Sequence, residues 1–523
     1  MTVFSSTLHQ GLSNRVNFVH IRPISEHGLS VGLLLDPLHA NRVLDIGPSS
    51  DKPLESEAFR GLWEEKAELR RFKDGSIAES VVWDLSRPED AALIPSKIVR
   101  YLLEKHYSIP GDAVTSFSSS QNWLGLIQIP SSARDAITIK GSEKLGFRPM
   151  LSGYDSLYKV LKDIDHKLPL AVLNVQPSSP LLRYSSTFVP HPVDIHRFSA
   201  APDCIKYIPS ADVILQFESS PKWPDDLAAV QKVKLALFEK LARTLPSRLP
   251  ETKAEIVFDA GASEIEDQAS LVVMLPEGVS FRLRIYYERE KTMLERVLQE
   301  EKPLFATSLP YPPRRLVAPA LAIHLERFHY LPAHHSSLAP MHHRYPTYSS
   351  ACRLLKRWFA AHMLLGKSGV REEIVELIMA GVYLEPGRGK TPSSAVGGFM
   401  RAMELLECWD WRTEPLLIPI ISASSPSSAS ASGRVRFPAE LKEEALKLFE
   451  HLRAKEKGTE AKEGSVHAWV VCTEQDMEGM RWTKGIGKAV AARVGALAKA
   501  TVKAVKDSVE RGSLDVKVRT SLL

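Results

Sequence analysis

Residues 211–245 read ADVILQFESSPKWPDDLAAVQKVKLALFEKLARTL and place a short apolar run directly before a long amphipathic stretch. The apolar run at 211–218 predicts a buried strand, because it is short and rich in β-branched and aromatic residues. Asp225 and Asp226 precede the amphipathic stretch, where acidic side chains complement the positive end of a helix over 227–245. We therefore expect a domain of mixed helices and strands built around this unit.

Similar patterns recur on both sides of this unit. Further strands are expected at 28–35, 77–83, 170–175, 254–258, 270–275, 279–287 and 466–473. Further helices are expected at 59–69, 97–105, 155–162, 316–328, 348–365, 372–382, 395–408, 438–455 and from 488 onward. A chain of 523 residues exceeds one hydrophobic core, so we expect roughly three to four domains of the α+β class.

The composition is that of an ordinary folded protein, with 44% hydrophobic and 25% charged residues and a formal net charge of +5. Such a small excess does not by itself indicate a nucleic-acid binder; only local clustering of basic residues could. The four cysteines, Cys204, Cys352, Cys408 and Cys472, are too far apart to suggest a zinc site or a disulfide framework. With neither a signal-peptide layout nor an apolar run long enough to span a membrane, we expect an intracellular protein without membrane contact.

One linker stands out from the rest of the chain. Residues 422–433 read SASSPSSASASG, a composition typical of flexible connections. The elements before residue 95 are too few to bury a core alone, so we expect the chain to begin inside a domain, as a fragment or an unusual gene product would.

Three stretches carry a specific likeness. They are FRGLWEEKAELRRFKDGSIAESVVW at 59–83, DVILQFESSPKWPDD at 212–226, and CRLLKRW at 352–358, the last followed by PSSAVGGF at 392–399 and WDW at 409–411. Together, and in this order, they resemble the C-terminal portion of the Nrap family of nucleolar ribosome-biogenesis proteins. That family resembles two tandem copies of an archaeal CCA-adding enzyme.

The resemblance implies a tandem nucleotidyltransferase-like and PAP/OAS-like architecture. The expected parts are the end of a PAP/OAS-like module (Nrap domain 3-like) at 1–95, a nucleotidyltransferase-like domain (domain 4-like) at 96–245, a PAP/OAS-like domain (domain 5-like) at 246–420, a Ser/Ala linker at 421–433 and a small α/β domain (domain 6-like) at 434–523. The strands over 254–287 could also complete the sheet of the nucleotidyltransferase-like domain.

The residues at the expected catalytic centre argue against catalysis. An active nucleotidyltransferase holds two metal ions with three carboxylates, two on one strand as Asp-x-Asp and one from a neighbouring strand. Asp212 supplies the first, but Ile214 holds the second position and cannot ligate Mg²⁺. The neighbouring strand offers Arg282 and Arg284, and the upstream turn near 180–186 has no glycine for close approach to a phosphate. We expect no enzyme activity, no metal and no cofactor, with Asp212 as the remnant of a metal site.

Other acidic and histidine groups have ordinary explanations. Glu218, Asp225 and Asp226 could form a metal cluster, but a strand end and a helix start explain them better. The turn Asp74-Gly75-Ser76 could mimic a phosphate loop, but a hairpin is expected because no Asp-x-Asp strand follows. The remaining candidates are imidazoles without cysteine or acidic partners, which we expect in a polar loop between helices: His334, His335, His342 and His343.

Four basic groups are candidates for RNA contact. Arg70, Arg71 and Lys73 surround Phe72, which could stack a base or belong to the core. Arg282 and Arg284 alternate on a strand; facing the degenerate cleft they would make it positive, and facing outward they would be ordinary surface charges. Both outcomes remain open from the sequence.

The other two groups lie on expected helices. Arg353, Lys356 and Arg357 share one helix face, which could contact phosphates but is more simply a solvated face. Beyond residue 480, basic residues with few acids form an amphipathic helix whose apolar side packs and whose basic side faces solvent or RNA: Lys484, Lys488, Arg493, Lys499, Lys503, Lys506 and Arg511. This helix is the best electrostatic candidate in the chain.

The resemblance supplies the biological setting. It implies a nuclear, nucleolar assembly factor of the small-subunit processome that acts in pre-rRNA processing and possible tRNA export. Its implied partners are pre-rRNA or U-three snoRNA, UTP-C subunits and casein kinase two. The alternatives are an active CCA-adding or poly(A)-type transferase and a protein scaffold that does not touch RNA.

Overall fold

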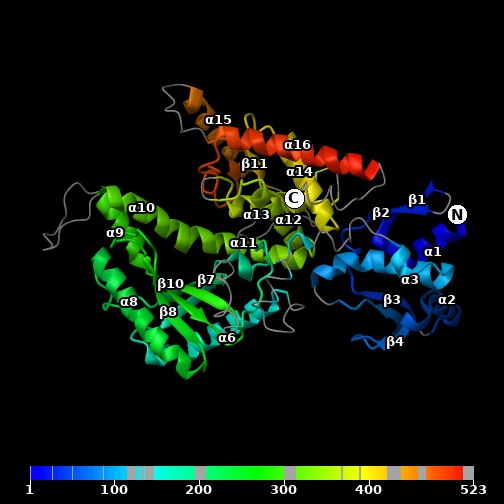
Figure 1. Cartoon of the computed structure of the whole chain (residues 1–523), viewed down its shortest axis with the longest axis horizontal. Helices are drawn as coiled ribbons and strands as arrows, with labels where there is room; N and C mark the ends of the chain where they lie inside the picture. The colour runs from blue at the N-terminus through cyan, green and yellow to red at the C-terminus, as the bar shows by residue number, and fades with distance from the viewer. Residues whose placement is uncertain are drawn as a thin grey trace. The chain divides into compact units, whose positions relative to one another are not determined.

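A computed structural model of the chain describes residues 2–25, 28–49, 51–85, 88–114, 125–127, 129, 131, 135, 146–194, 208–299, 314–366, 369–387, 390–420, 437–457 and 467–510. The chain forms two compact units: unit 1 comprises residues 1–127 and 341–523, and unit 2 comprises residues 128–340. Figure 1 shows the elements of both. Each unit is described by itself.

Unit 2 is built on a five-stranded mixed sheet. Its strands lie in the order β6 (Val172–Pro177), β7 (Ser210–Phe217), β10 (Ser280–Tyr286), β9 (Ala269–Met274) and β8 (Lys253–Phe258). The central pair β7–β10 is parallel and the other neighbours are antiparallel. The sheet therefore takes strands from both sides of the expected boundary at residue 245, because β8, β9 and β10 complete it.

The two faces of this sheet differ. Ala211, Val213, Leu215 and Phe217 are at most 5% exposed and join a core that includes residues of α6 (Arg148–Asp163) and α8 (Leu227–Thr244). Each such buried side chain contributes about 1.5–3 kcal/mol relative to exposure. The alternate residues of β7 point to the opposite face, as a strand requires.

A long helical segment contacts that opposite face at its π-helical turn. It consists of α10 (Arg314–Leu325), a π-helical turn (Glu326–Tyr330) and α11 (Leu331–Arg344). Tyr286 of β10 contacts Phe328 of the π-helical turn, with ring centroids 5.7 Å apart. The remaining helix of unit 2 among the described elements is α9 (Glu288–Gln299), which directly follows β10.

The N-terminal part of unit 1 contains a hairpin of β1 (Val16–Ser25) with β2 (Gly28–Leu35) and a sheet in the order β3 (Leu44–Ser49), β5 (Ile77–Val82), β4 (Glu68–Arg71). Three helices accompany them: α1 (Thr2–Leu12), α2 (Pro53–Trp63) and α3 (Ile94–Tyr107). Trp63 and Trp83, each at most 3% exposed, lie in the core of this part.

The rest of unit 1 is mainly helical. It contains α12 (Tyr348–Ala361), α13 (Glu372–Leu384), α14 (Ala395–Cys408), α15 (Ala439–Lys457), α16 (Lys488–Glu510) and the short parallel pair β11 (Leu416–Leu417) and β12 (Val471–Cys472). Trp358 is fully buried and its Nε1 donates to Thr501 Oγ1 of α16 at 3.1 Å. This contact ties α16 to α12.

Most of the expected elements are present, and the differences have local causes. The helix expected at 59–69 ends at Trp63, because the chain turns there into β4. The sequence did not predict several of the described elements: α1, β1, β3, β4, α9, α11 and the two-residue β11. The Ser/Ala linker at 421–433 lies outside the described residues.

Candidate functional site

The strand pair β7–β10 carries the residues of the expected catalytic centre. Its parallel register aligns Arg282 with Asp212 and Arg284 with Ile214, so all four side chains belong to one face of the sheet. Arg282 Nη1 lies 3.7 Å from Asp212 Oδ1, and both side chains are 42% exposed. The structure thus brings a guanidinium group beside Asp212, where metal binding would require a carboxylate.

Arg284 points along the same face but is held by acids that the sequence reading missed. Its side chain is 9% exposed, with Nη1 donating to Asp267 Oδ2 at 2.9 Å and Nη2 to Asp259 Oδ2 at 3.0 Å. Arg327, from the π-helical turn, donates to the same two carboxylates, to Asp259 Oδ2 at 2.7 Å and Asp267 Oδ2 at 3.2 Å. These four residues, Asp259, Asp267, Arg284 and Arg327, form what we call the arginine–aspartate cluster.

The cluster joins the helical segment to the sheet. Asp259 directly follows β8 and Asp267 precedes β9, so they stand at the two ends of the loop that connects these strands. Burial raises the pKa of Asp259, but Arg284 and Arg327 outweigh it and leave the pKa below its usual range. The guanidinium groups therefore keep this carboxylate charged, and the charged pairs hold the π-helical turn against the open face of the sheet.

A second set of buried charges adjoins the cluster. Lys234 of α8, 1% exposed, places Nζ 2.8 Å from Glu290 Oε2 and 3.3 Å from Asp267 Oδ1. Gln231 Nε2 also donates to Glu290 Oε1 at 2.6 Å. Burial would raise the pKa of Glu290, but Lys234 and His324 outweigh it and lower the pKa to about 2. The glutamate is thus ionised and satisfied inside the unit.

These residues do not fit the divalent metal ions that the fold would imply. The position beside Asp212 on β7 is Ile214, 4% exposed, and the facing strand supplies arginines. Burial raises the pKa of Asp212, against the opposing effect of Arg282, Arg284 and Arg327. Across the described residues, no group of three or more His, Cys, Asp or Glu is placed to hold a metal ion.

The face is also not a positive cleft. The cations on and around it are equal in number to the carboxylates that they contact, with Lys234 contributed by α8 and Arg327 by the π-helical turn: Lys234, Arg282, Arg284 and Arg327 against Asp212, Asp259, Asp267 and Glu290. The sequence left open whether Arg282 and Arg284 lie on this face or point away from it, and the structure places both on it. Arg282 lies near Asp212 of β7, and the buried Arg284 pairs with Asp259 and Asp267 from the loop between β8 and β9, so carboxylates compensate both charges.

The upstream turn lies where the sequence placed it. Ser178 N, just after β6, donates to the carbonyl oxygen of Asp212 at 3.1 Å, so the turn abuts the start of β7. Its residues form a short 3-10 helix, Pro180–Leu182, whose preceding Ser179 accepts a hydrogen bond from Leu181 N. Tyr184, with a φ of 62°, occupies a backbone conformation that favours glycine. The turn carries side chains where a phosphate loop has bare backbone.

The other acidic candidates have structural roles. Asp226 Oδ1 accepts from Ala229 N at 2.8 Å and caps α8, and Asp225 pairs with Arg289 at 2.7 Å. Gly75, with a φ of 86°, turns the β4–β5 hairpin, as expected. The histidine expectation is wrong in its location: His334, His335 and His342 are buried in α11, with His343 on the same helix, and not in a loop.

The first basic group lies on an edge strand. Arg70 and Arg71 belong to β4, the edge of its sheet, and Lys73 follows it; all three are exposed. Phe72 is half-buried beside them, and Arg70 pairs weakly with Glu68 at 3.1 Å. The three charges are therefore accessible to a ligand, and RNA contact by them stays a prediction.

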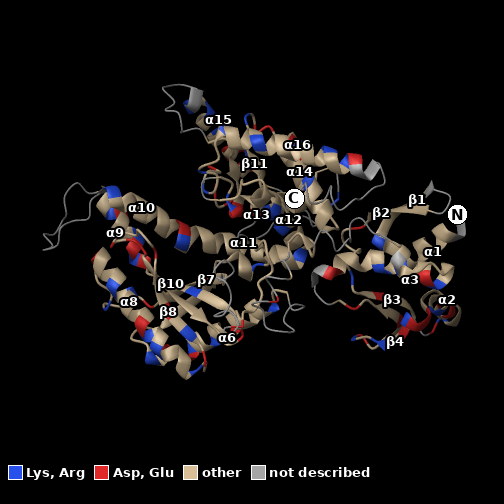
Figure 2. Ribbon diagram, in the orientation of Figure 1, with Lys and Arg blue, Asp and Glu red and all other residues tan. Residues whose placement is uncertain are grey.

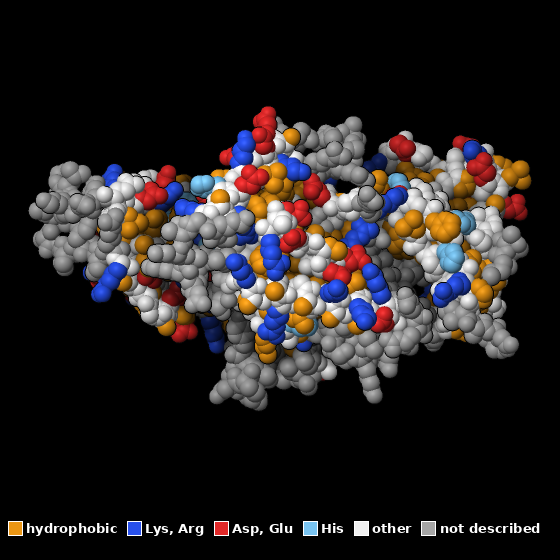
Figure 3. All heavy atoms as spheres, turned by 90° about the horizontal axis from the view of Figure 1, so that it is seen from above, with side chains coloured by type: hydrophobic (Ala, Val, Ile, Leu, Met, Phe, Trp, Pro, Cys, Tyr) orange, Lys and Arg blue, Asp and Glu red, His pale blue; other side chains and the backbone are white. Residues whose placement is uncertain are grey.

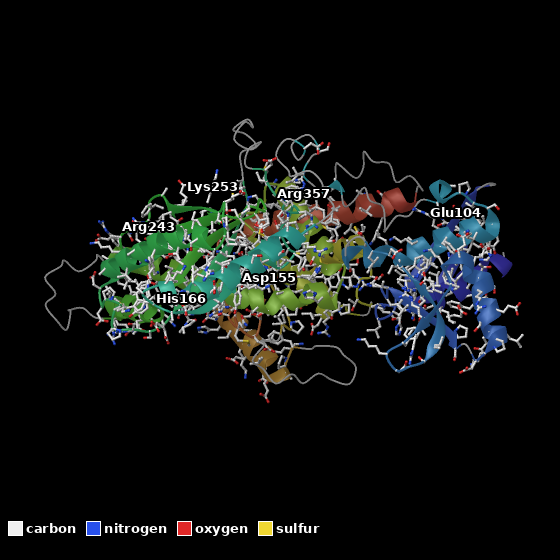
Figure 4. The ribbon with its side chains drawn as sticks, turned by 90° about the horizontal axis from the view of Figure 1, so that it is seen from below. Glu104, Asp155, His166, Arg243, Lys253 and Arg357 are labelled. Atoms are coloured by element: carbon white, nitrogen blue, oxygen red, sulfur yellow. The ribbon has the colours of Figure 1, made fainter. Side chains whose placement is uncertain are left out.

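The basic group on α12 is not the expected exposed face. Arg353 is 3% exposed and its Nη2 donates to the Ile127 carbonyl oxygen at 3.1 Å. Lys356 is fully buried and pairs with Glu372 at 2.6 Å and Glu376 at 2.7 Å. Only Arg357, half-buried and labelled in Figure 4, keeps part of its surface. The helix is nearly surrounded, so neither a solvated nor a phosphate-contacting stripe is present for Arg353 and Lys356.

The C-terminal basic group is exposed. Lys484, Lys488, Arg493 and Lys499 are all accessible, as are Lys503 and Lys506, whereas Ala491, Val494, Ala498 and Val502 on the other side are buried. The expected amphipathic helix is confirmed, and Figure 2 shows basic segments recurring along α16. Arg511 lies outside the described residues.

The site residues that sequence reasoning missed are Asp259, Asp267, Glu290 and Arg327. They lie in a loop or in helices among other charged residues, and only the fold brings them to Arg284 and Lys234. No spacing in the sequence could have revealed that pairing, because Arg327 lies 68 residues from Asp259.

Three family models match the chain. Nrap protein domain 3 matches residues 1–108, Nrap protein nucleotidyltransferase domain 4 matches 128–343, and Nrap protein PAP/OAS1-like domain 5 matches 345–523. The third match runs through the expected linker at 421–433. The expected nucleotidyltransferase-like and PAP/OAS-like classes are confirmed by the second and third matches.

Curated relatives extend the likeness over most of the chain. U3 small nucleolar RNA-associated protein 22 is 30% identical over 93% of this chain in Schizosaccharomyces pombe and 29% identical over 94% in Saccharomyces cerevisiae, and the matches cover 41% and 38% of those proteins. Human Nucleolar protein 6 is 32% identical over 79% of this chain and 36% of its own length. The chain therefore spans about two fifths of the length of these relatives.

Among solved structures, mtPAP in complex with GTP aligns over 98% of this chain and 97% of its own, with 10% identity and a TM-score of 0.35. A cytoplasmic RNA terminal U-transferase aligns over 74% of this chain and 94% of its own, with 8% identity and the same TM-score of 0.35. Alignments of this quality carry no functional argument. Among the described helices, none combines the length and the apolar character that a membrane crossing needs.

Proposed function

The chain belongs to the Nrap family, and we propose that it acts as a non-catalytic, RNA-associated assembly factor in small ribosomal subunit biogenesis. In this role it works in the nucleolus, within the small-subunit processome, on pre-rRNA or U-three snoRNA. The names of the curated relatives, U3 small nucleolar RNA-associated protein 22 and Nucleolar protein 6, support this setting.

The observation that carries the non-catalytic part is the β7–β10 pair. A nucleotidyl transfer centre needs carboxylates to bridge two metal ions, yet Asp212 has Ile214 on its own strand and Arg282 opposite. The nearby Asp259 and Asp267 are engaged by Arg284 and Arg327. Guanidinium groups that pair with these carboxylates neutralise the charge that would attract a divalent metal ion and occupy lone pairs that it would use.

An incorporation assay tests this part. The purified chain, a radiolabelled nucleoside triphosphate mixture, Mg²⁺ or Mn²⁺ and a short RNA primer should give no labelled product, whereas a poly(A) polymerase run in parallel should. Incorporation that disappears in Asp212→Ala but persists in Asp225→Ala would overturn the proposal. Asp225 is the matched control because it is an exposed carboxylate paired with Arg289 outside the β7–β10 site.

The RNA-associated part rests on the accessible basic residues. Those that remain available are Arg70, Arg71, Lys73, Arg282, Lys484, Lys488, Arg493 and Lys499. Ultraviolet crosslinking of the native particle, followed by sequencing of RNA bound to this chain, should recover pre-rRNA or U-three snoRNA fragments. Recovery of no RNA would favour the alternative of a protein scaffold without RNA contact.

The finer partners follow from family membership alone. We extend the proposal to UTP-C subunits and casein kinase two as protein partners and to a role in tRNA export. Affinity purification of the tagged full-length protein under low salt should co-purify both sets of subunits, and nuclear tRNA should accumulate on its depletion. Loss of rRNA processing without tRNA accumulation would remove the export role and leave the processome role in place.

A further inference from the structure

Helix α16 presents an accessible face of unusual composition. Its lysines Lys488, Lys499, Lys503 and Lys506 are exposed, and the residues between them on that face include Ala492, Gly495 and Ala496. Figure 3 views the face from above and shows Lys and Arg side chains on it, with acidic side chains among them. We call the four lysines the lysine stripe.

The stripe follows from the helical repeat. At about 100° per residue, Lys499 lies about 20°, Lys503 about 60° and Lys506 about 0° from Lys488 around the helix axis. The four ammonium groups therefore project from one narrow arc over about 27 Å of helix length. Arg493 lies about 140° away, and its Nη2 donates to the His362 carbonyl oxygen at 3.2 Å, so it belongs to a different flank.

The charges of the stripe are barely compensated. Asp507, half-buried near the end, is the acidic residue among the side chains described in α16. Lys506 Nζ lies 3.7 Å from Glu404 Oε1, with side chains 63% and 49% exposed, a surface pair of small energetic value. Helix α15 carries exposed lysines too, but glutamates alternate with them and Lys447 pairs with Glu443 at 2.8 Å.

The chemistry of the stripe selects a type of ligand. Lysine is a compact point charge on a flexible stem and lacks the rigid planar fork of arginine, so a row of lysines favours charge over a fixed hydrogen-bonding geometry. Small residues lie between the lysines, so the face offers no aromatic ring on which an unpaired base could stack. What remains is a row of cations on a smooth surface, which suits the phosphate backbone of paired RNA, recognised by shape and charge.

From these observations we infer that the lysine stripe of α16 binds the phosphate backbone of double-stranded RNA segments without reading their sequence. This inference rests on the proposed function, in which the chain is RNA-associated, and it assigns that contact to one surface. Binding depends on release of counterions, so its affinity falls steeply with salt.

The test compares two triple variants of the whole chain. One is Lys488→Gln, Lys499→Gln, Lys503→Gln; the matched control is Lys442→Gln, Lys447→Gln, Lys455→Gln on α15, which removes the same charge from exposed positions. The probe is a fluorescein-labelled RNA hairpin, read by anisotropy over a salt series. Circular dichroism melting should give the same transition for both variants and the wild type.

The stripe variant should lose most of its hairpin affinity and show a slope of log K against log salt that is less steep by about 2–3 units. Between about 50 and about 200 mM salt, the wild type should therefore lose about 40-fold more affinity than the stripe variant does. The α15 control should keep the wild-type slope. Equal slopes for the stripe variant and the wild type would overturn the inference while leaving an RNA role intact.

Two further probes distinguish paired RNA from single-stranded RNA and from an acidic protein as the ligand of the lysine stripe. Oligouridine should bind more weakly than the hairpin, and tighter binding of oligouridine would overturn the assignment to paired RNA. Polyglutamate that outcompetes the hairpin would assign the stripe to an acidic protein instead. A wild-type chain that binds no RNA at any salt would overturn both this inference and the RNA part of the proposed function.

Discussion

The arginine–aspartate cluster of unit 2 and the lysine stripe of unit 1 use the same kinds of charge in opposite ways. In the cluster, Asp267 is 2% exposed and meets Arg284, Arg327 and Lys234. In the stripe, four lysines share one accessible helix face and have almost no acidic partners. A buried charge is costly unless it is paired, so the cluster must be satisfied internally, whereas water satisfies the stripe and leaves it available to a ligand.

The largest effect should come from breaking the cluster at its centre. Asp267→Ala would remove the carboxylate that Lys234, Arg284 and Arg327 share, so Lys234 would keep only Glu290 and the two guanidinium groups only Asp259 among the acids of this network. We expect a loss of about 3–5 kcal/mol in the free energy of unfolding, as for other broken buried pairs. Urea unfolding with hydrogen exchange of β9 and β10 measures it. Asp225→Ala, which removes the 72% exposed partner of Arg289, should lower the free energy of unfolding by less than about 1 kcal/mol. Equal losses for the two variants would contradict the difference between buried and exposed pairs.

A comparison of two lysines in unit 1 distinguishes a buried, paired charge that stabilises the fold from an exposed charge that can contact a ligand. Lys356→Ala removes a fully buried ammonium group from Glu372 and Glu376 and should destabilise the chain by about 3 kcal/mol. Lys499→Ala, on the exposed stripe, should change the free energy of unfolding by less than about 0.5 kcal/mol. Chemical unfolding of both variants checks this, and a small effect at Lys356 would contradict the buried pairing.

The buried charges should also make unit 2 sensitive to acid. Glu290 has a pKa of about 2 against an ordinary 4.5, so its contribution is fully present above about pH 4.5 and is lost as pH falls toward 2. Glu290→Gln removes this dependence. The stability gap between wild type and variant should therefore narrow by about 2–3 kcal/mol over that window, measured by urea unfolding at each pH. A constant gap would mean that Glu290 is not ionised in the folded unit.

The smallest effects belong to exposed pairs. Arg282→Gln removes a partner of Asp212 at 3.7 Å with both side chains 42% exposed, and should cost less than about 1 kcal/mol. Arg243→Gln on α8, labelled in Figure 4 and paired with Glu239, should cost less than about 0.5 kcal/mol. Thermal melting of both variants and the wild type measures these losses in the free energy of unfolding. A loss of several kcal/mol for Arg282→Gln would show that Arg282 contributes to stability as the buried charges of the arginine–aspartate cluster do.

The strand–helix unit at 211–245 shows how far periodicity reaches. The apolar run gave a strand within one residue of β7, and Asp226 was recognised at the start of α8. Alternation also placed Arg282 and Arg284 on one face of β10. Periodicity could not supply the partners of Arg284, because Asp259 and Asp267 reach it only through the antiparallel order β10–β9–β8.

The basic helices make the same point. Arg353, Lys356 and Arg357 and the lysines of α16 look alike as patterns, since both sets recur at helical spacing. Helix α12 is largely enclosed by its neighbours, with Arg353 and Lys356 buried and Arg357 half-buried, whereas one side of α16 is exposed. The number of helices that pack around a given helix is a property of the whole fold and leaves no local signature.

The sequence alone determined the identities of the residues: an isoleucine and two arginines where metal binding needs carboxylates, and lysines without acids along one helix. Tertiary structure alone decided which of those charges are satisfied. Desolvation depends on everything that surrounds a side chain, so only the folded chain could pair Arg284 with Asp259 and Asp267, bury Lys356, and leave the lysine stripe exposed to solvent.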